Sequence, residues 1–378
     1  MSEARKIVVI GGTGHFGARI CHRLAGEANT ELIVTSRDVA RAEVLVSELR
    51  RNEPHASFSA AALDQSSPDF EGDLRKLGPD IVIHTAGPYQ GQSYRVARAC
   101  MECGSHYVDL ADGREFVQGF DSLHEEAIRR DVLLVSGAST LPGLSSAVID
   151  HLQGRFEAIH EIQISIAPAH RTPRGTGTVK AVLSYCGKPF RVLENGSWVT
   201  RHGWQDMRMQ RYPGLGFRLS GACDVPDLGL LPGTIPGVRT VTFHAALEAK
   251  WEQIALWKMA WATRLRIVRN WDRFVPAFQW LSSRLIRLGS ETGGMRMRLS
   301  GVAKDQTART VTWDLTARQN HGPEIPCTPA LILARKLAAG QIARRGAFAC
   351  LGMITLSEFD AEVSDLDIDW QVGEASDA

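Results

Sequence analysis

Short runs of β-branched residues alternate with helical patterns over roughly the first third of the chain. Lys6–Ile10 and Asp80–Thr85 are apolar enough to form strands that are buried on both faces. The other expected strands are 31–35, 57–61, 106–110 and 132–135, and the expected helices are 16–24, 39–50, 94–103 and 115–130. Strands that alternate with helices of about 10 to 15 residues predict an α/β fold with a doubly wound parallel sheet.

The pattern changes at about Leu144. The expected strands become longer and alternate apolar with polar residues, with turns at Asn195-Gly196 and around Lys304-Asp305-Gln306. These strands are 161–167, 191–200, 240–248, 295–302 and 310–317, and the segment 251–288 between them is helical in pattern. Such a pattern predicts a second domain of α+β type. A helix is expected over 328–337, and the acidic end after Glu358 is expected to be a tail.

Composition narrows the class of protein. A length of 378 residues favours two domains, and a formal net charge of +1 gives no reason to expect a nucleic-acid partner. Met1–Lys6 leads directly into a strand, which leaves no room for a signal peptide. The seven cysteines are scattered, and Cys100 and Cys103 have the pattern of core residues rather than metal ligands. We therefore expect a cytoplasmic protein without a metal centre.

Three glycines follow the first strand. Gly12, Gly14 and Gly17 have the G-x-G-x-x-G spacing, and Thr13, His15 and Phe16 lie between them. The first glycine permits a tight turn, the second a close approach of a pyrophosphate, and the third a close packing of helix on strand. A pyrophosphate at this turn would accept hydrogen bonds from the N-terminus of the following helix. The turn predicts a dinucleotide site.

The end of the second strand distinguishes NADP from NAD. An Asp or Glu at this point would accept from the ribose hydroxyls of NAD, but the chain has Ser36 and Arg37, with Arg41 one helical turn later. These residues suit a 2′-phosphate, so we expect NADP(H). Arg37 could equally be a solvated charge, and Asp38 could cap the next helix. The remaining predicted cofactor contacts are Asp64 at the adenine and Thr85-Ala86-Gly87-Pro88 at the nicotinamide ribose.

The chain also resembles the saccharopine dehydrogenase-like NADP-binding family. The resemblance is carried by Gly87–Gln92, His106–Gly113, Gly137–Gly143 and, near the end, Thr328–Ile342. It implies a Rossmann domain with an inserted α+β domain, whose mixed sheet serves substrate binding and dimerisation, and an active-site cleft between the two. The implied parts are a Rossmann NADP-binding domain over 1–143, the inserted domain over 144–325, a returning segment over 326–356 and an acidic tail over 357–378.

The resemblance implies hydride transfer to or from a C=N bond, with a small-molecule substrate and a homodimer. True saccharopine reductases have Asp where this chain has Leu141, which argues against saccharopine itself as substrate. Two alternatives stand beside imine reduction. One is a trans-acting enoyl reductase acting on the C=C bond of a lipid or polyketide, and the other is an NADP(H)-binding sensor or scaffold without turnover.

Candidates for catalysis come from both domains. Tyr89 and Gln90 follow the nicotinamide loop and are expected to face the cleft. In the second domain the candidates are His170, Arg171 and Tyr185, with Arg171 and Arg174 able to hold a carboxylate. Solvation of the arginines and a core position for Tyr185 are the alternatives. An imine can arrive protonated, so a dedicated acid is optional.

The segment 251–288 combines five tryptophans with six arginines. One interpretation is an interfacial helix pair that touches a membrane or admits an apolar substrate. The other, which we favour from the sequence, is a helical lid or dimer face with its basic residues in water.

Overall fold

The computed structural model describes residues 4–172 and 175–374, and the chain divides into two compact units. Unit 1 consists of Met1–Leu144 and Glu324–Ile354, and unit 2 of Ser145–Pro323 and Thr355–Ala378. The chain therefore leaves unit 1, builds most of unit 2, returns to unit 1 and ends in unit 2. No helix in the described ranges is long and apolar enough to cross a membrane.

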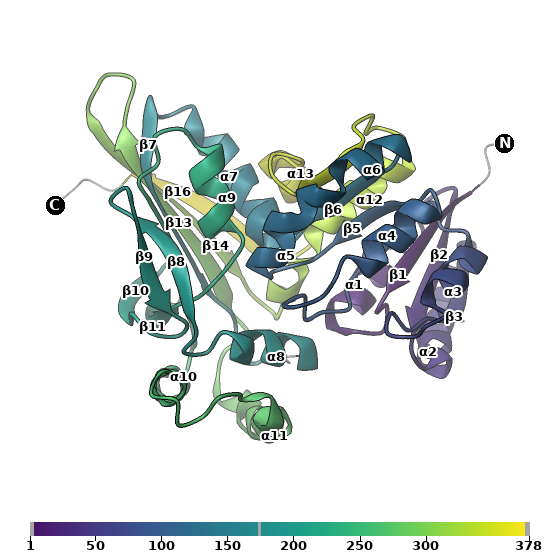
Figure 1. Cartoon of the computed structure of the whole chain (residues 1–378), viewed down its shortest axis with the longest axis horizontal. Helices are drawn as coiled ribbons and strands as arrows, with labels where there is room; N and C mark the ends of the chain where they lie inside the picture. The colour runs from purple at the N-terminus through teal and green to yellow at the C-terminus, as the bar shows by residue number, and fades with distance from the viewer. Residues whose placement is uncertain (1–3, 173–174, 375–378) are drawn as a thin grey trace. The chain divides into compact units, whose positions relative to one another are not determined.

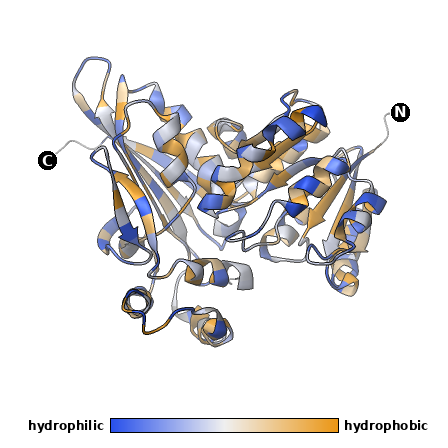
Figure 2. Cartoon of the chain, in the orientation of Figure 1, coloured by the Kyte–Doolittle hydropathy of each residue, from blue (hydrophilic) through white to orange (hydrophobic). Residues whose placement is uncertain are grey.

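Unit 1 is built on a seven-stranded parallel sheet with the order β15-β6-β5-β4-β1-β2-β3 (Figure 1). Its strands are β1 (Arg5–Ile10), β2 (Thr30–Ser36), β3 (Ser57–Ala62), β4 (Ile81–His84), β5 (His106–Asp109), β6 (Leu133–Ser136) and β15 (Gly346–Ala349). The central strands are largely apolar, as the hydropathy colours of Figure 2 show, because helices bury both faces of a doubly wound sheet. The chain order reverses between β1 and β4.

The helices of unit 1 lie close to the predicted positions, except that the sequence does not predict the helix at 70–77 and that the one predicted over 115–130 is divided. They are α1 (His15–Leu24), α2 (Val39–Asn52), α3 (Phe70–Leu77), α4 (Arg95–Glu102), α5 (Arg114–Gln118), α6 (His124–Arg129) and α12 (Thr328–Ala338). The predicted continuous helix 115–130 is wrong, because a 3-10 turn at Gly119–Leu123 separates α5 from α6. Gly119 is a poor helix former, and a Cβ there would lie 2.7 Å from the Tyr94 hydroxyl oxygen.

Unit 2 is built on a nine-stranded mixed sheet. Its main path is β10-β11-β12-β7-β13-β14-β16, and β8 pairs with both β12 and β9. The strands are β7 (Ala158–Ala167), β8 (Pro189–Glu194), β9 (Ser197–His202), β10 (Arg208–Tyr212), β11 (Gly216–Ala222), β12 (Thr240–Ala246), β13 (Gly293–Val302), β14 (Ala308–Ala317) and β16 (Ile368–Glu374). β7 and β12 run parallel, and the other pairs are antiparallel.

The helices of unit 2 are α7 (Ser145–Gln153), α8 (Thr176–Ser184), α9 (Asp227–Thr234), α10 (Lys250–Arg264), α11 (Val275–Leu285) and α13 (Leu356–Glu362). The predicted turns are present: Asn195 and Gly196 both have positive φ, which suits a tight hairpin between β8 and β9. The strand pair β10–β11 has no counterpart in the sequence prediction.

The segment predicted as an acidic tail is instead part of the sheet of unit 2. Thr355 caps α13 in a reciprocal capping box with Glu358, and β16 pairs antiparallel with β14 along its whole length. The acidic residues alternate with apolar ones, so that Phe359 is fully buried and the ring of Trp370 packs against that of Trp313. The net acidity of this stretch obscured an amphipathic pattern. Residues 375–378 lie outside the described residues.

Candidate functional site

The glycine turn between β1 and α1 has the shape of a phosphate cradle. A Cβ on Gly12 would lie 2.9 Å from a Val34 methyl carbon, and one on Gly14 would lie 3.0 Å from the carbonyl oxygen of Gly11. A Cβ on Gly17 would lie only 2.1 Å from that same oxygen. The left-handed residue of the turn is Gly11, with φ of +77°, rather than Gly12. The turn therefore requires its glycines for steric reasons.

The N-terminus of α1 opens onto this cradle. Among the described residues no side chain caps α1, and its first turn, His15–Phe16–Gly17, contains no acidic residue. The first N–H of the helix to bond back into the turn is that of Ala18, at 3.0 Å from the Gly14 oxygen. Burial, together with the nearby Arg19, lowers the pKa of His15 to about 4, so this side chain is neutral at pH 7. Uncapped N–H groups at a helix N-terminus fit a pyrophosphate.

The end of β2 lies beside the turn. The hydroxyl of Thr13 donates to the Ser36 hydroxyl at 3.1 Å, and the N–H of Asp38 donates to the same oxygen at 3.3 Å. Arg37 and Arg41 are both exposed. Asp38 caps α2 by accepting from the N–H of Ala40, which is the helix-cap role considered for it. A buried hydroxyl and two exposed guanidinium groups are a donor set that suits a phosphate.

The loop after β4 is attached to the glycine turn. The N–H of Thr85 donates to the Ile10 oxygen, and its hydroxyl donates to the same oxygen at 2.9 Å. The carbonyl oxygen of Ala86 accepts from the side-chain amides of Gln65 and Gln92, and Gln92 also donates to the Pro88 oxygen at 2.6 Å. The loop 85–88, which carries the predicted nicotinamide contacts, is thus held at the point where the sheet order reverses.

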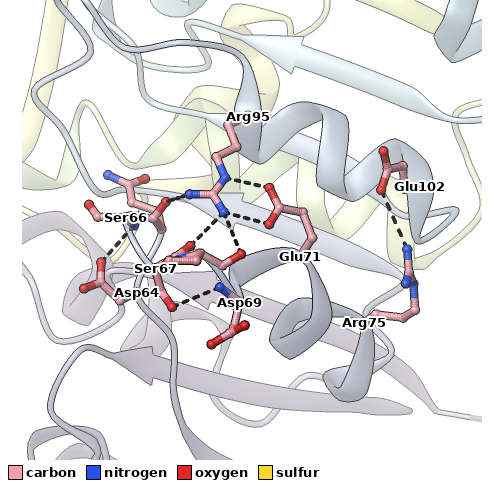
Figure 3. A network of polar contacts seen from close by, with 10 residues as sticks. Asp64, Ser66, Ser67, Asp69, Glu71, Arg75, Arg95 and Glu102 are labelled. Atoms are coloured by element: carbon pink, nitrogen blue, oxygen red, sulfur yellow. Dashed lines mark hydrogen bonds and ion pairs between the residues drawn. The ribbon is translucent and has the colours of Figure 1, made fainter.

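The loop after β3 contains Asp64 and is held by a single arginine (Figure 3). Arg95, from α4, donates to both carboxylate oxygens of Glu71 and to the carbonyl oxygens of Gln65, Ser67 and Pro68. The carboxylate of Asp64 accepts from the N–H of Ser66 at 2.9 Å, which closes a local turn. Asp64 is half-buried at the carboxyl edge of the sheet, and its predicted role at the adenine stays a prediction.

A chain of hydrogen-bonded polar side chains runs beneath this edge. None of its residues is among those predicted from the sequence to bind the cofactor or to act in catalysis. It leads from Gln65 to His84 (2.7 Å), from His84 to the Tyr107 hydroxyl (3.0 Å) and from there to Asp109 (2.9 Å). The other oxygen of Asp109 accepts from the Ser136 hydroxyl and from the N–H groups of Gly137 and Ala111. His84 and Asp109 are the last residues of buried strands. A polar residue that ends an otherwise apolar strand is the signal that could have identified them.

The hydrogen-bond partners along this chain determine which side-chain atoms carry protons. The Ala86 oxygen can only accept, so the amide nitrogen of Gln65 faces it and the amide oxygen of Gln65 faces His84. A neutral His84 then donates from Nε2, and its Nδ1 lies 3.0 Å from the Tyr107 hydroxyl, which donates to the Asp109 carboxylate at 2.9 Å. Burial raises the pKa of Asp109 to about 6 and lowers that of His84 to about 3, so at pH 7 His84 is neutral and Asp109 is mostly ionised.

The catalytic candidates of unit 1 are turned inward. Tyr89 is buried, its hydroxyl donates to the His84 carbonyl oxygen at 2.6 Å, and burial holds its pKa well above the ordinary value. The expectation that Tyr89 faces a cleft does not agree with this position, because its ring packs between His84 and Phe116. Gln90 is half-buried and donates to the Asp112 carboxylate at 3.2 Å.

The candidates of unit 2 do not form one group. His170 is buried, with Nε2 3.0 Å from the Leu285 oxygen and Nδ1 3.5 Å from the Glu252 carboxylate. Arg171 is exposed and pairs with Glu291 at 3.2 Å, and Arg174 lies outside the described residues. Tyr185 is half-buried, with its ring stacked on that of Trp204. Their roles in catalysis stay predictions.

Comparison with known proteins agrees with this geometry. A family model described as the saccharopine dehydrogenase NADP binding domain matches residues 7–134, from β1 into β6. A comparison with curated proteins finds no match. The chain is similar to the solved apo form of histidine-tagged saccharopine dehydrogenase (L-Glu forming) from Saccharomyces cerevisiae. The TM-score is 0.67 with 14% identity, over 99% of this chain and 100% of that chain. At this identity the likeness shows the fold alone.

An amine dehydrogenase from Mycobacterium smegmatis is also similar, at 12% identity over 93% of this chain and 95% of that one. The TM-score of this match is 0.46. The matched domain and the cradle together show that unit 1 binds a nicotinamide dinucleotide of the NADP type, in the fold of a dehydrogenase. Residues 7–134 thus match the saccharopine dehydrogenase NADP binding domain, and the fold of the chain is similar to that of saccharopine dehydrogenase.

Proposed function

We propose that this protein is an NADP(H)-dependent oxidoreductase that transfers hydride to or from a C=N bond, such as an imine of an amino acid. The observation that carries the proposal is the cradle of Gly11–Gly17 at the carboxyl edge of the parallel sheet, beside the loop after β4.

Each part of the dinucleotide would be held by a different group of residues in unit 1. The cradle and the N-terminus of α1 would hold the pyrophosphate, and Ser36, Arg37 and Arg41 would hold the 2′-phosphate. Asp64 would meet the adenine, and the loop 85–88 would lie under the nicotinamide ribose. When bound, NADPH supplies the hydride. The chain supplies orientation, because a fixed reacting geometry accounts for much of the rate in such a reaction.

The hydrogen-bonding state of the titratable side chains at this edge favours a C=N substrate. The hydroxyls of Tyr89 and Tyr107 and both nitrogens of His84 are engaged by protein groups, and Asp109 is fully buried. A C=N bond that arrives protonated needs no acid from this edge, whereas reduction of a C=C bond needs a proton at carbon. Imine reduction is therefore the chemistry that these groups serve best.

Two other functions are distinguishable by experiment. An enoyl reductase acting on a lipid or polyketide would require a donor from unit 2, where Tyr185 and His170 are the candidates. A sensor or scaffold without turnover would fit Leu141, which is buried where a saccharopine reductase has Asp.

The test is a binding measurement followed by a substrate screen. All nine tryptophans lie in unit 2, so we would follow binding through the fluorescence of NADPH itself, with NADH in parallel. Pairs of amino acids with oxo acids or aldehydes, and enoyl thioesters, are then offered to the NADPH-loaded protein. Oxidation of NADPH by an amine and carbonyl pair is expected. Oxidation by enoyl thioesters alone would favour the second function, and tight binding without label exchange from either face of the cofactor would favour the third.

A further inference from the structure

Unit 2 carries a strongly basic and aromatic stretch, residues 250–288, which we call the α10–α11 segment. It contains eight Lys and Arg against two Asp and Glu, a net charge of +6, in a chain whose net charge is +1. Positive charge is therefore concentrated in about a tenth of the chain, and the remainder is acidic. Both helices lie at the lower margin of unit 2 in the view of Figure 1.

The same segment exposes large apolar side chains. Twelve such side chains are exposed in the described residues, and six of them belong to this segment. These are Trp251 (48%), Ile254 (40%), Leu265 (63%), Ile267 (73%), Trp280 (61%) and Leu281 (41%). Scattered exposed apolar residues are ordinary, but half of the total within a short stretch marks an interaction surface.

Except for Leu265 and Ile267, which follow α10, these exposed residues lie along the outer stripes of the two helices. On α10, Trp251, Ile254 and Lys258 are spaced three and four residues apart, which places them on one face. Leu265, which directly follows the helix, lies seven residues after Lys258 and continues that face. Gln253 and Ala260, on the opposite face, are fully buried, and α10 packs there against β11. On α11 the exposed stripe is Ala277, Trp280, Leu281 and Arg284. Apolar and basic side chains therefore share the outward faces.

Guanidinium groups lie directly over aromatic rings of this segment. Arg264 lies 4.9 Å from the ring centre of Trp261, Arg273 4.7 Å from Phe274, and Arg284 5.4 Å from Trp280. Such pairs keep a cation beside an apolar ring, which is the arrangement needed where phosphate groups and hydrocarbon meet.

We propose that the α10–α11 segment docks this protein on the surface of an anionic lipid bilayer, with Trp, Ile and Leu side chains in the headgroup boundary and arginines on lipid phosphates. Branched aliphatic residues such as Ile254, Ile267 and Leu281 contribute little to binding of nucleic acid, which favours a lipid surface. A symmetric contact with a second copy would bring two faces of charge +6 together. The segment would lie on the membrane without crossing it.

Flotation with vesicles tests the proposal. The protein is mixed with vesicles of phosphatidylcholine alone or of phosphatidylcholine with phosphatidylglycerol, at low and at high salt. We expect binding to the anionic vesicles, a blue shift of tryptophan emission, and release by salt. Trp280→Ser combined with Ile267→Ser should weaken binding about tenfold or more. Arg266→Gln combined with Arg269→Gln should weaken it about 25-fold, at roughly fivefold for each arginine.

Matched variants elsewhere serve as controls. Trp198→Ser combined with Ile128→Ser removes an exposed Trp and an exposed Ile outside the segment, and Arg129→Gln combined with Arg130→Gln removes two exposed arginines. They should bind as the wild type does, and circular dichroism melts show that all variants are folded. Absence of binding to anionic vesicles would overturn the proposal, as would equal losses in segment and control variants. So would a dimer in size-exclusion chromatography that only the segment variants disrupt, because the face would then belong to a second copy.

Discussion

At the scale of single residues, we propose that the side chains that follow β2 determine the choice of cofactor. Ser36 is buried and bonded to Thr13 of the glycine turn, whereas Arg37 is exposed beside it. A 2′-phosphate would meet a buried hydroxyl and an exposed guanidinium, whereas NADH offers these groups only a neutral 2′-hydroxyl. We therefore propose that Arg37 contributes more to the affinity for NADPH than to the affinity for NADH.

We predict that Arg37→Ala raises the Kd for NADPH by about 10- to 100-fold, as expected for the loss of one or two charge-assisted hydrogen bonds. The Kd for NADH should change less than about threefold. Titrations followed by NADPH or NADH fluorescence measure both. Arg51→Ala, an exposed arginine at the end of α2, is the control. Equal losses for the two cofactors would show that Arg37 is a solvated charge.

The proton on Asp109 has consequences for stability. Burial raises the pKa of Asp109 from 3.8 to about 6, so the folded state holds a proton that the unfolded state has already lost. The stabilisation is complete below about pH 4, decreases as the pH rises toward 6 and then levels off, by on the order of 3 kcal/mol. The titratable groups facing Asp109 are Tyr107, Tyr89, Tyr94 and Cys350, whose pKa values are all raised.

Asp109→Asn is expected to fold and to remove this pH dependence. The amide oxygen would accept from Ser136, Gly137 and Ala111, and the NH2 group would donate to the Tyr107 oxygen, whose own proton would then go to His84. The difference in free energy of unfolding between wild type and variant should change between about pH 4 and pH 6, measured by urea denaturation. A constant difference would mean that Asp109 is ionised throughout. Asp109→Leu, which leaves the Ser136 hydroxyl and the N–H groups of Gly137 and Ala111 without their acceptor, should cost about 1 to 3 kcal/mol at any pH.

At the scale of elements, one helix residue positions a loop of the cofactor edge. Arg95 connects α4 with the loop after β3 and with the first turn of α3 (Figure 3). Its guanidinium holds the pKa of Glu71 at about 2, and its remaining donors satisfy three carbonyl oxygens of a loop that has few other ties. The position of Asp64 and the contact from Gln65 to His84 depend on this anchor.

Arg95→Gln should loosen the loop without unfolding the sheet. We expect a three- to tenfold rise in the Kd for NADPH, corresponding to about 1 kcal/mol, and faster amide exchange over residues 64–69. Arg98→Gln is the matched control, because Arg98 lies one turn along α4 and makes only an exposed ion pair with Glu126. Faster exchange with unchanged NADPH affinity would remove this loop from the binding site.

At the scale of the whole molecule, the chain passes through each unit twice. The second passage supplies β15 to the sheet of unit 1 and β16 to the sheet of unit 2. β16 covers the edge of β14, whose N–H and C=O groups would otherwise be exposed. The last strand of the chain is therefore structural.

Truncation before Asp365 tests this role. Loss of β16 should expose Trp313 and the β14 edge, lower the melting temperature of unit 2 by about 4 °C or more, and increase aggregation. Tryptophan fluorescence monitors unit 2, because the eight tryptophans that remain all lie there. A variant that lacks only residues 375–378 is the control. An unchanged melting temperature in the longer truncation would mean that the segment contributes little.

Some features of this protein follow from neighbours in the sequence alone. The alternation of strands and helices, the glycine turn and the Ser36-Arg37 pair depend on backbone sterics and on side chains a few positions apart, so the sequence determined the α/β domain and its NADP site. The Asn195-Gly196 hairpin is of the same kind, because positive φ at two adjacent residues is a local requirement.

Other features arise only when distant segments meet. The places of β15 and β16, the anchoring of a loop by Arg95 and the hydrogen bond between His84 and Tyr107 each join residues tens or hundreds of positions apart. The same holds for Tyr89. The sequence predicts that Tyr89 faces a cleft, but the packing of unit 1 buries its side chain. Burial and hydrogen-bond partners are properties of the folded chain, and they decided which polar groups are available for chemistry.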